Sequence, residues 1–233
     1  MIFPSRLFLL FLSFLSYSIS ATTVKTISAD LDRHLKKGST EQSISGHIYY
    51  TDKKSILVIN KPLSQWMIFE NNRMIIYYPA EKNAIRIISR DPLSMPFFQT
   101  FIGPATDNFG LAAKGYSISW NEMKQDTLFI HWKPPRETKM LGEFTVMLQK
   151  NRLVSTEQKA SDGQVISRSF FAAHIRHGNS FFPRSVTSMI FSGKDTVVIE
   201  SITYSNIVFD RTLPDTILEF SLPVRTMVKD IEW

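Results

Sequence analysis

GYSISW, residues Gly115 to Trp120, carries the clearest structural pattern in the chain. In it Tyr116, Ile118 and Trp120 alternate with two serines, and this period of two indicates a half-buried β-strand. Because successive side chains of a strand point to opposite faces, the three large residues are predicted to share one face. The stretch therefore favours a sheet, and the same period recurs on either side of it.

The alternating pattern continues through most of the chain. Turn signals separate the runs, and Ser161-Asp162-Gly163 and the loop 192–195 predict hairpins. Further strands are expected at residues 42–50, 55–60, 65–69, 73–78, 83–88, 127–132, 144–148, 153–159, 164–170, 184–191, 196–204 and 218–222. No regular alternation of strands and helices is present, so a parallel sheet is not expected, and an antiparallel sheet of this size is expected to curl.

Residues 26–37 are predicted to form an N-terminal helix. Ser28 is a suitable N-cap, and acidic residues follow it in the first turn, where they suit the helix dipole. Leu31 and Leu35 are four residues apart and would share one helix face. Two lysines and Gly38 would then end the helix.

The segment 91–113 interrupts the strand pattern with prolines and glycines among large apolar residues. We expect one or two short helices or a loop there, apolar on one side through Phe97, Phe98, Phe101 and Ile102. A connection of this length is usually functional or ordered by packing. It would therefore act either as a lid or as a plug at one end of the core.

The first 21 residues have the layout of a secretory signal peptide. Arg6 precedes the run Leu7 to Leu15, which is apolar except for one serine, and small residues follow up to Ala21. The run is shorter than the roughly 20 apolar residues of a membrane helix, so cleavage near Ala21 is expected, with an uncleaved anchor as the alternative. Residues 22–233 are predicted to form a single domain in the periplasm.

Composition limits the classes of function. The net charge is +6, but the basic residues are scattered, and nucleic-acid binding would need a concentrated stripe. A mild attraction to anionic membranes is one reading of the charge, and an ordinary solvated surface is the other. Cysteine is absent, which excludes disulfides and thiolate metal sites. An apolar content of 43% is sufficient for a core without covalent links.

Catalytic motifs are not recognisable in the sequence. His174 and His177 are close to each other, but no carboxylate accompanies them, and His131 alternates with apolar neighbours and is expected on the surface. No Gly-x-Ser-x-Gly elbow and no glycine-rich phosphate loop occurs. The sequence predicts no enzyme, no cofactor and no metal site, and an exported hydrolase with an assembled site is kept as a less favoured alternative.

Aromatic and aliphatic residues on the expected strands are candidates for the lining of an apolar cavity. The candidates for binding a hydrophobic ligand are Trp66, Ile68, Ile76, Tyr78, Tyr116, Ile118, Trp120, Ile130, Trp132 and Phe144. The alternative is that they form an ordinary closed core, as most apolar strand residues do.

Several short motifs resemble the outer-membrane lipoprotein carrier (LolA-like) superfamily over residues 25–225. They are the expected helix 29–37 leading into SGHIYY at 45–50, the Lys61-Pro62 step followed by Trp66, MIIYYP at 74–79, the paired strands of 149–170 around Asp162-Gly163, and the segments 213–215 and 220–223. One departure is Gln65, which stands near where the family pattern has a buried basic residue.

The resemblance implies a mainly β (α+β) fold, in which a curved antiparallel sheet forms an incomplete barrel with helices as a lid over its mouth. Leu31, Leu35, Phe97, Phe98 and Phe101 would belong to that lid. The implied function is that of a monomeric periplasmic carrier. It would shield the acyl chains of a lipoprotein or lipid between an inner-membrane donor and an outer-membrane acceptor, with transient membrane contact. The alternative is an envelope sensor that acts with a signalling partner.

Overall fold

The described part of the chain forms one large sheet of fourteen strands and one small hairpin. The structure is a computed structural model, and it describes residues 24–51, 53–70, 72–89, 107–136, 141–192 and 195–232. The predicted signal peptide at 1–21 lies outside the described residues, as do Phe97, Phe98, Phe101 and Ile102.

The strands of the large sheet follow the chain closely. The first half of the chain contributes β1 (Thr26–Lys37), β2 (Thr40–Thr51), β3 (Ser55–Lys61), β4 (Gln65–Glu70), β5 (Arg73–Tyr78) and β6 (Asn83–Ile88). The second half contributes β7 (Ser117–Lys124), β8 (Thr127–Lys133), β9 (Leu141–Gln149), β10 (Arg152–Ala160), β11 (Val165–Ala172), β14 (Ser185–Ser192), β15 (Asp195–Phe209) and β16 (Met227–Glu232). The spatial order is β16-β6-β5-β4-β3-β2-β1-β15-β14-β11-β10-β9-β8-β7. Strands β12 (Ile175–His177) and β13 (Ser180–Phe182) pair separately.

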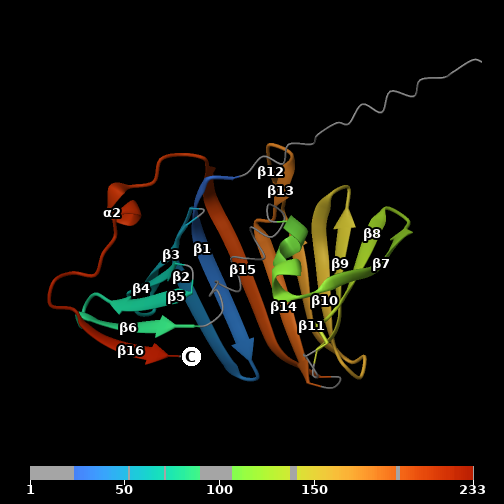
Figure 1. Cartoon of the computed structure of the whole chain (residues 1–233), viewed down its shortest axis with the longest axis horizontal. Coiled ribbons are helices and arrows are strands. Elements are labelled where there is room, and N and C mark those ends of the chain that lie inside the picture. The colour runs from blue at the N-terminus through green and yellow to red at the C-terminus, as the bar shows by residue number, and fades with distance from the viewer. Residues whose placement is uncertain are drawn as a thin grey trace, which may run out of the picture.

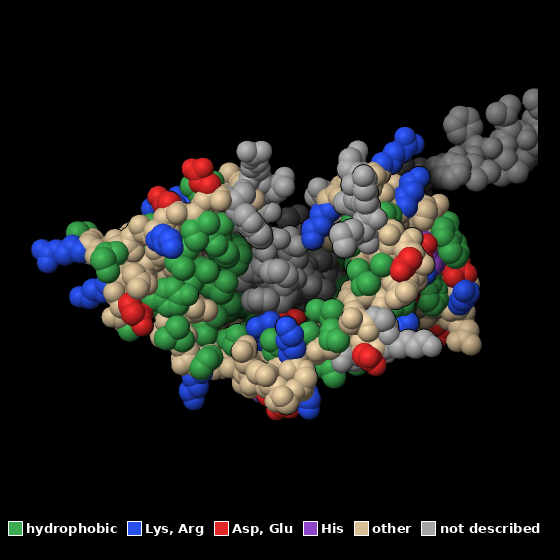
Figure 2. Space-filling view, turned by 90° about the horizontal axis from the view of Figure 1, so that it is seen from below, with side chains coloured by type: hydrophobic (Ala, Val, Ile, Leu, Met, Phe, Trp, Pro, Cys, Tyr) green, Lys and Arg blue, Asp and Glu red, His purple; other side chains and the backbone are tan. Residues whose placement is uncertain are grey.

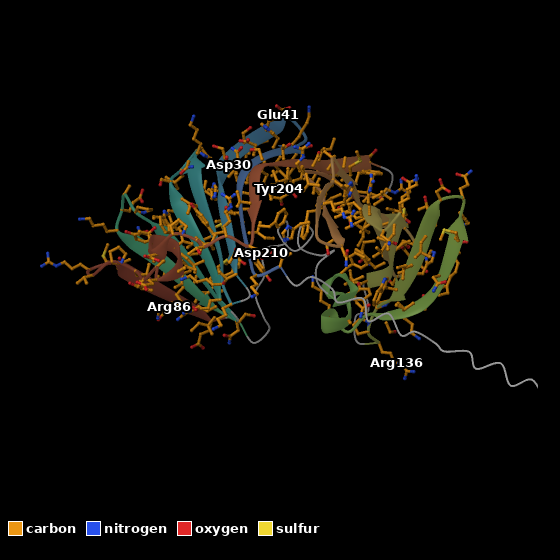
Figure 3. All side chains as sticks on the ribbon, turned by 90° about the horizontal axis from the view of Figure 1, so that it is seen from above. Asp30, Glu41, Arg86, Arg136, Tyr204 and Asp210 are labelled. Atoms are coloured by element: carbon orange, nitrogen blue, oxygen red, sulfur yellow. The ribbon has the colours of Figure 1, made fainter. Side chains whose placement is uncertain are left out.

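The sheet bends into an open U (Figures 1 and 3). Strands β2 to β6 with β16 form the first arm, β7 to β10 form the second arm, and β1, β15, β14 and β11 form the floor between them. All neighbouring strands run antiparallel except β16, which pairs parallel to β6. The predicted curved antiparallel sheet is confirmed, and it is open.

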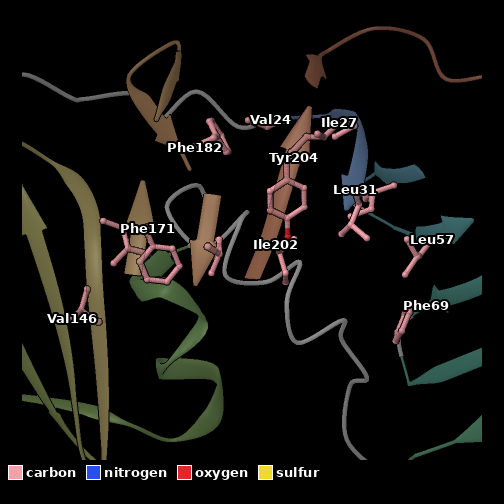
Figure 4. Close-up of a cluster of buried hydrophobic side chains, with 14 of the residues drawn as sticks. Val24, Ile27, Leu31, Leu57, Phe69, Val146, Phe171, Phe182, Ile202 and Tyr204 are labelled. Carbon is pink, nitrogen blue, oxygen red and sulfur yellow. The ribbon is translucent and has the colours of Figure 1, made fainter. Parts of the chain in front are cut away.

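The main hydrophobic core lies on the inner face of the U. Phe69 on the first arm, Ile202 and Tyr204 on the floor, and Val146 on the second arm belong to one buried cluster. Their side chains point into the space between the arms (Figure 4). In the view from below, hydrophobic side chains also gather on the first arm (Figure 2). The sheet therefore has a continuous apolar inner face.

A second, smaller cluster lies on the outer face of the first arm. The chain leaves β15, and residues 213–220, here called the strap, pack against β2 to β5 before β16 begins. The strap contains the short helix α2 (Asp215–Leu218), whose Ile217 is 6% exposed. Ile217 and Leu213 pack with Ile56 and Ile68 of the sheet.

The predicted N-terminal helix is wrong, because residues 26–37 form strand β1 at the centre of the sheet. Positions i and i+4 share a face in a strand as well as in a helix, so Leu31 and Leu35 did not distinguish the two. Ile27, Ala29 and Leu31 are all buried and follow the period of two. Leu31 and Leu35 are therefore part of the floor and do not belong to a lid.

Most of the other predicted strands are confirmed, with bounds that differ by at most five residues. The exception is the strand expected at 218–222, where the strap lies, and the last strand is β16 instead. Of the predicted central helices, the described part contains only two short 3-10 turns, η2 (Asp107–Gly110) and η3 (Ala112–Lys114). A helical lid is thus not confirmed. Within the described ranges no helix is long and apolar enough to cross a membrane.

Candidate ligand-binding face

The floor of the U is apolar because one parity of each strand faces inward. Leu31 of β1 lies opposite Tyr204 of β15, and Ile202 lies opposite Val186 of β14. Val186 in turn lies opposite Phe171 of β11. Each of these side chains is less than 5% exposed. Direct cross-strand neighbours share a face, and Ile202 is two residues from Tyr204, so these five side chains form two adjoining rows of one face, here together called the apolar level.

The second arm brings together three of the predicted ligand-binding residues. Ile130 of β8 lies opposite Val146 of β9, and Trp132 lies opposite Phe144. Trp132 is buried, whereas Ile130 and Phe144 are partly buried and pack against the same inner core. The sequence predicts that Ile130, Trp132 and Phe144 share a face. In the structure they do share one, and it is the inner face of the U.

The first arm contributes Ile76 and Tyr78. Ile76 lies opposite Met67, which lies opposite the buried inner residue Leu57, so Ile76 has the inward parity. Tyr78 lines a cavity of about 460 Å³ at the end of the arm, together with Leu63 and residues of β6 and β16. Both residues are partly buried.

Trp66 and Ile68 were predicted to line the inner face, and that placement is wrong. Ile68 lies opposite Ile56 and belongs to the outer cluster under the strap. The ring of Trp66 stacks on Phe220 of the strap with centroids 4.6 Å apart. Strand β4 is apolar at both parities, so its pattern did not reveal which parity turns inward. Met67 takes the inner face instead.

The three large residues of 115–120 do not share a face. Tyr116 precedes strand β7 and is buried in the inner core, whereas Ile118 is half exposed on the last strand of the second arm. A β-bulge between Ile118 and Trp120 shifts the register, so Trp120 lies opposite His131 on the outer face. An extra residue in one strand reverses the parity that follows it, which the alternating pattern alone could not predict.

His131 was expected on the surface, but it is 8% exposed because Trp120 covers it. Its Nδ1 lies 3.1 Å from Oε1 of Glu143, which also accepts a hydrogen bond from Lys159 at 3.0 Å. Burial alone would raise the pKa of Glu143, but the hydrogen bonds from Lys159 and His131 outweigh it and hold that pKa below its usual value. This charged cluster lies on the outer face, away from the apolar core.

The other two histidines of interest do not meet at a common site. His174 Nε2 bonds the carbonyl of Leu153 at 2.7 Å, and His177 Nε2 pairs with Asp210 at 2.7 Å. Among the described residues, no group of three or more His, Asp or Glu side chains is arranged to hold a metal ion.

The inner face also carries an ion pair that the sequence analysis missed. Nε of Arg33 in β1 donates to Oε1 of Glu200 in β15 at 2.5 Å, and the two side chains are 23% and 22% exposed. Burial raises the pKa of the neighbouring Tyr204 far above its ordinary value, and the charge of Glu200 raises it further. The local helix signals of residues 26–37 conceal the inward parity of Arg33.

The chain matches no family model and no curated protein. Solved structures do resemble it. A DUF1329 family protein from Desulfovibrio piger has a TM-score of 0.61 and 14% identity, over 86% of this chain and 92% of that one. A LolA superfamily protein from Nitrosomonas europaea has a TM-score of 0.57 and 14% identity, over 83% and 89%. The fold is LolA-like.

A third similar structure is a domain from Vibrio parahaemolyticus that bears the name outer membrane lipoprotein-sorting protein. Its TM-score is 0.59 at 12% identity, over 82% of this chain and 88% of that one. The resemblance read from the sequence motifs is thereby confirmed for the fold, and identities of 12 to 14% show the fold alone.

Proposed function

We propose that this protein binds the acyl chains of a lipoprotein or lipid on the inner face of its sheet. The observation that carries the proposal is the continuous apolar face formed by both arms and the floor of an open U. An acyl chain that moves from water to such a face gains roughly 0.8 kcal/mol per CH₂ group. Because the sheet is open, a chain can enter between the arms without breaking strand pairs.

Partly buried residues provide the contact surface on both arms. Met67, Met74 and Ile76 line the first arm, and Ile130 and Phe144 line the second. Methionine side chains are flexible and polarizable, so they adapt to chains of different shape. The face therefore suits a flexible hydrocarbon better than one rigid ligand.

The role that follows is that of a non-enzymatic carrier in the periplasm. It would shield acyl chains between an inner-membrane donor and an outer-membrane acceptor, and it would act as a monomer with transient membrane contact. The apparent signal sequence at 1–21 and the name of the similar Vibrio domain support this role.

The test is mass spectrometry of lipids and acyl peptides on mature protein purified from its native envelope without detergent. Stoichiometric acylated protein is expected for a lipoprotein carrier. Bound free phospholipid would assign lipid transport instead. A protein that carries nothing and binds no acyl probe would refute the proposal.

A matched pair of variants tests the position of the site. Ile76→Glu places a charge on the inner face and is expected to lower the affinity for the apolar probe N-phenyl-1-naphthylamine by at least about tenfold. Ile199→Glu makes the same change at a residue that is 36% exposed, and it should bind like the wild type. Equal affinity in the two variants would place the site elsewhere.

A further inference from the structure

A polar row crosses the floor of the U directly beside the apolar level. Glu200 of β15 lies opposite Ser188 of β14, Ser188 lies opposite Ser169 of β11, and Ser169 lies opposite Thr156 of β10. Arg33 of β1 completes the row through its ion pair with Glu200. We call these five residues the polar row.

The polar row faces the same side as the apolar core. Arg33, Glu200 and Ser188 are each two residues from a buried member of that core, namely Leu31, Ile202 and Val186. Side chains two apart on a strand share a face. Glu200, Ser188 and Ser169 therefore lie on the inner face two residues along their strands from Ile202, Val186 and Phe171. Arg33 lies opposite Ile202 and reaches Glu200 diagonally.

Four members of the polar row are joined in pairs by hydrogen bonds, and all five are half-buried. The hydroxyls of Ser169 and Ser188 lie 2.8 Å apart, and all five side chains are of intermediate exposure. In the view from below, basic side chains lie on the floor between the arms (Figure 2). A ligand whose hydrocarbon lies on the apolar level would thus place its polar end against this row.

The chemistry of the row selects the kind of polar end. The Nε–Nη2 edge of Arg33 faces Glu200, which neutralises its charge, and the Nη1 side of the fork is not part of that pair. The hydroxyls of Ser169, Ser188 and Thr156 can each donate and accept. Such a set matches uncharged groups with ester carbonyls and hydroxyls, because the charges of Arg33 and Glu200 cancel within the row.

We propose that the polar row is a subsite for the glycerol-ester end of an acylated ligand. The inference rests on the proposed binding of acyl chains to the inner face, and it adds which part of the ligand is recognised. Stability alone does not require the pair, because apolar side chains of similar volume often replace such pairs without loss.

The test compares three probes on the mature protein: N-phenyl-1-naphthylamine, monolauroylglycerol and laurate. The double variant Arg33→Leu with Glu200→Leu should keep the wild-type affinity for N-phenyl-1-naphthylamine. Its affinity for monolauroylglycerol should fall by about tenfold, as expected for two lost hydrogen bonds. The wild type should also prefer monolauroylglycerol to laurate.

Two further variants serve as control and as a milder test. Lys36→Leu with Glu41→Leu removes an ion pair between β1 and β2 whose side chains are 57% and 70% exposed, and should leave all three affinities unchanged. Ser169→Ala with Ser188→Ala removes only two hydroxyls and should weaken monolauroylglycerol binding by about fivefold, even where the ion-pair variant fails to fold.

The outcomes separate the two proposals. If the wild type binds N-phenyl-1-naphthylamine but neither double variant of the polar row changes the affinity for monolauroylglycerol, the subsite is refuted and the acyl-binding face stands. A preference for laurate that depends on Arg33 would also refute it, since the row would then be an anion site. If the wild type binds none of the probes, both proposals fall.

Discussion

The indole of Trp120 lies flat on the imidazole of His131, with ring centroids 3.8 Å apart and planes 1° from parallel. This contact closes the outer face of the second arm, because Trp120 is 47% exposed while His131 beneath it is 8% exposed. It exists because the bulge after Ile118 turns Trp120 to the outer face. Trp120, one of the residues predicted to line an apolar cavity, instead covers a charged cluster.

Replacement of Trp120 should therefore affect stability and leave ligand binding intact. Trp120→Ala removes the stack and exposes His131 to water, and we expect the free energy of unfolding to fall by about 1–2 kcal/mol. Urea denaturation measures this loss. Binding of N-phenyl-1-naphthylamine should not change. A folded Trp120→Ala protein without probe binding would restore Trp120 to the ligand site, as the alternating sequence pattern predicted.

The strap is expected to depend on Ile217. Ile217→Ala leaves a cavity in the outer cluster with Ile56, Ile68 and Leu213, and should cost about 2–4 kcal/mol. Leu218→Ala is the matched control, because Leu218 is 41% exposed and its loss should stay within about 0.5 kcal/mol. Hydrogen exchange should rise in the strap and in β16, which follows it. Equal exchange in the two variants would show that the strap does not depend on the buried residue.

The pattern of single strands predicts the sheet well but not which face turns inward. Ile130, Trp132 and Phe144 were placed correctly relative to one another because β8 and β9 keep a regular register there. The prediction for Trp66 is wrong because β4 is apolar at both parities, so its pattern does not show which parity turns inward. The strap that covers its outer side comes from a segment about 150 residues later.

The misread first strand has a different cause. Residues 26–37 contain a cap-like serine, early acids and late lysines, all of which are local helix signals. Strand pairing on both sides overrides them, since β1 aligns twelve residues with β2 and ten with β15. The same error hid Arg33, whose role depends on the partner Glu200 at a distance of 167 residues in sequence.

Gly46 is expected to be needed for the close approach of β2 and β3. A Cβ atom at this position would lie 2.4 Å from the carbonyl oxygen of Val58 and 3.1 Å from Cα of Ile59. Gly46→Ala must therefore push the two strands apart, and we expect a loss of about 1–3 kcal/mol in the free energy of unfolding. Thermal unfolding tests this, and an unchanged midpoint would show that the strands separate without cost.

Acid should weaken the fold through Asp30. Its carboxylate accepts hydrogen bonds from Asn206 and pairs with His47, both at 2.6 Å, and these contacts hold the pKa of Asp30 below its ordinary value. A carboxyl group whose pKa is lower in the folded state adds stability above its unfolded pKa of about 4, and that stability is lost as the pH falls through the folded pKa.

The variant Asp30→Asn has no ionisable group at this position, so it lacks this contribution at every pH. The free energy of unfolding of the wild type should therefore approach that of the variant as the pH falls from about 6 to about 3. The effect should be small, because the side chain of Asp30 is 41% exposed and solvent screens its charge. Chemical denaturation across that range measures it, and an NMR titration of the Asp30 carboxyl carbon gives an independent check. A midpoint at or above the ordinary aspartate value would mean that Asn206 and His47 do not stabilise the charged form.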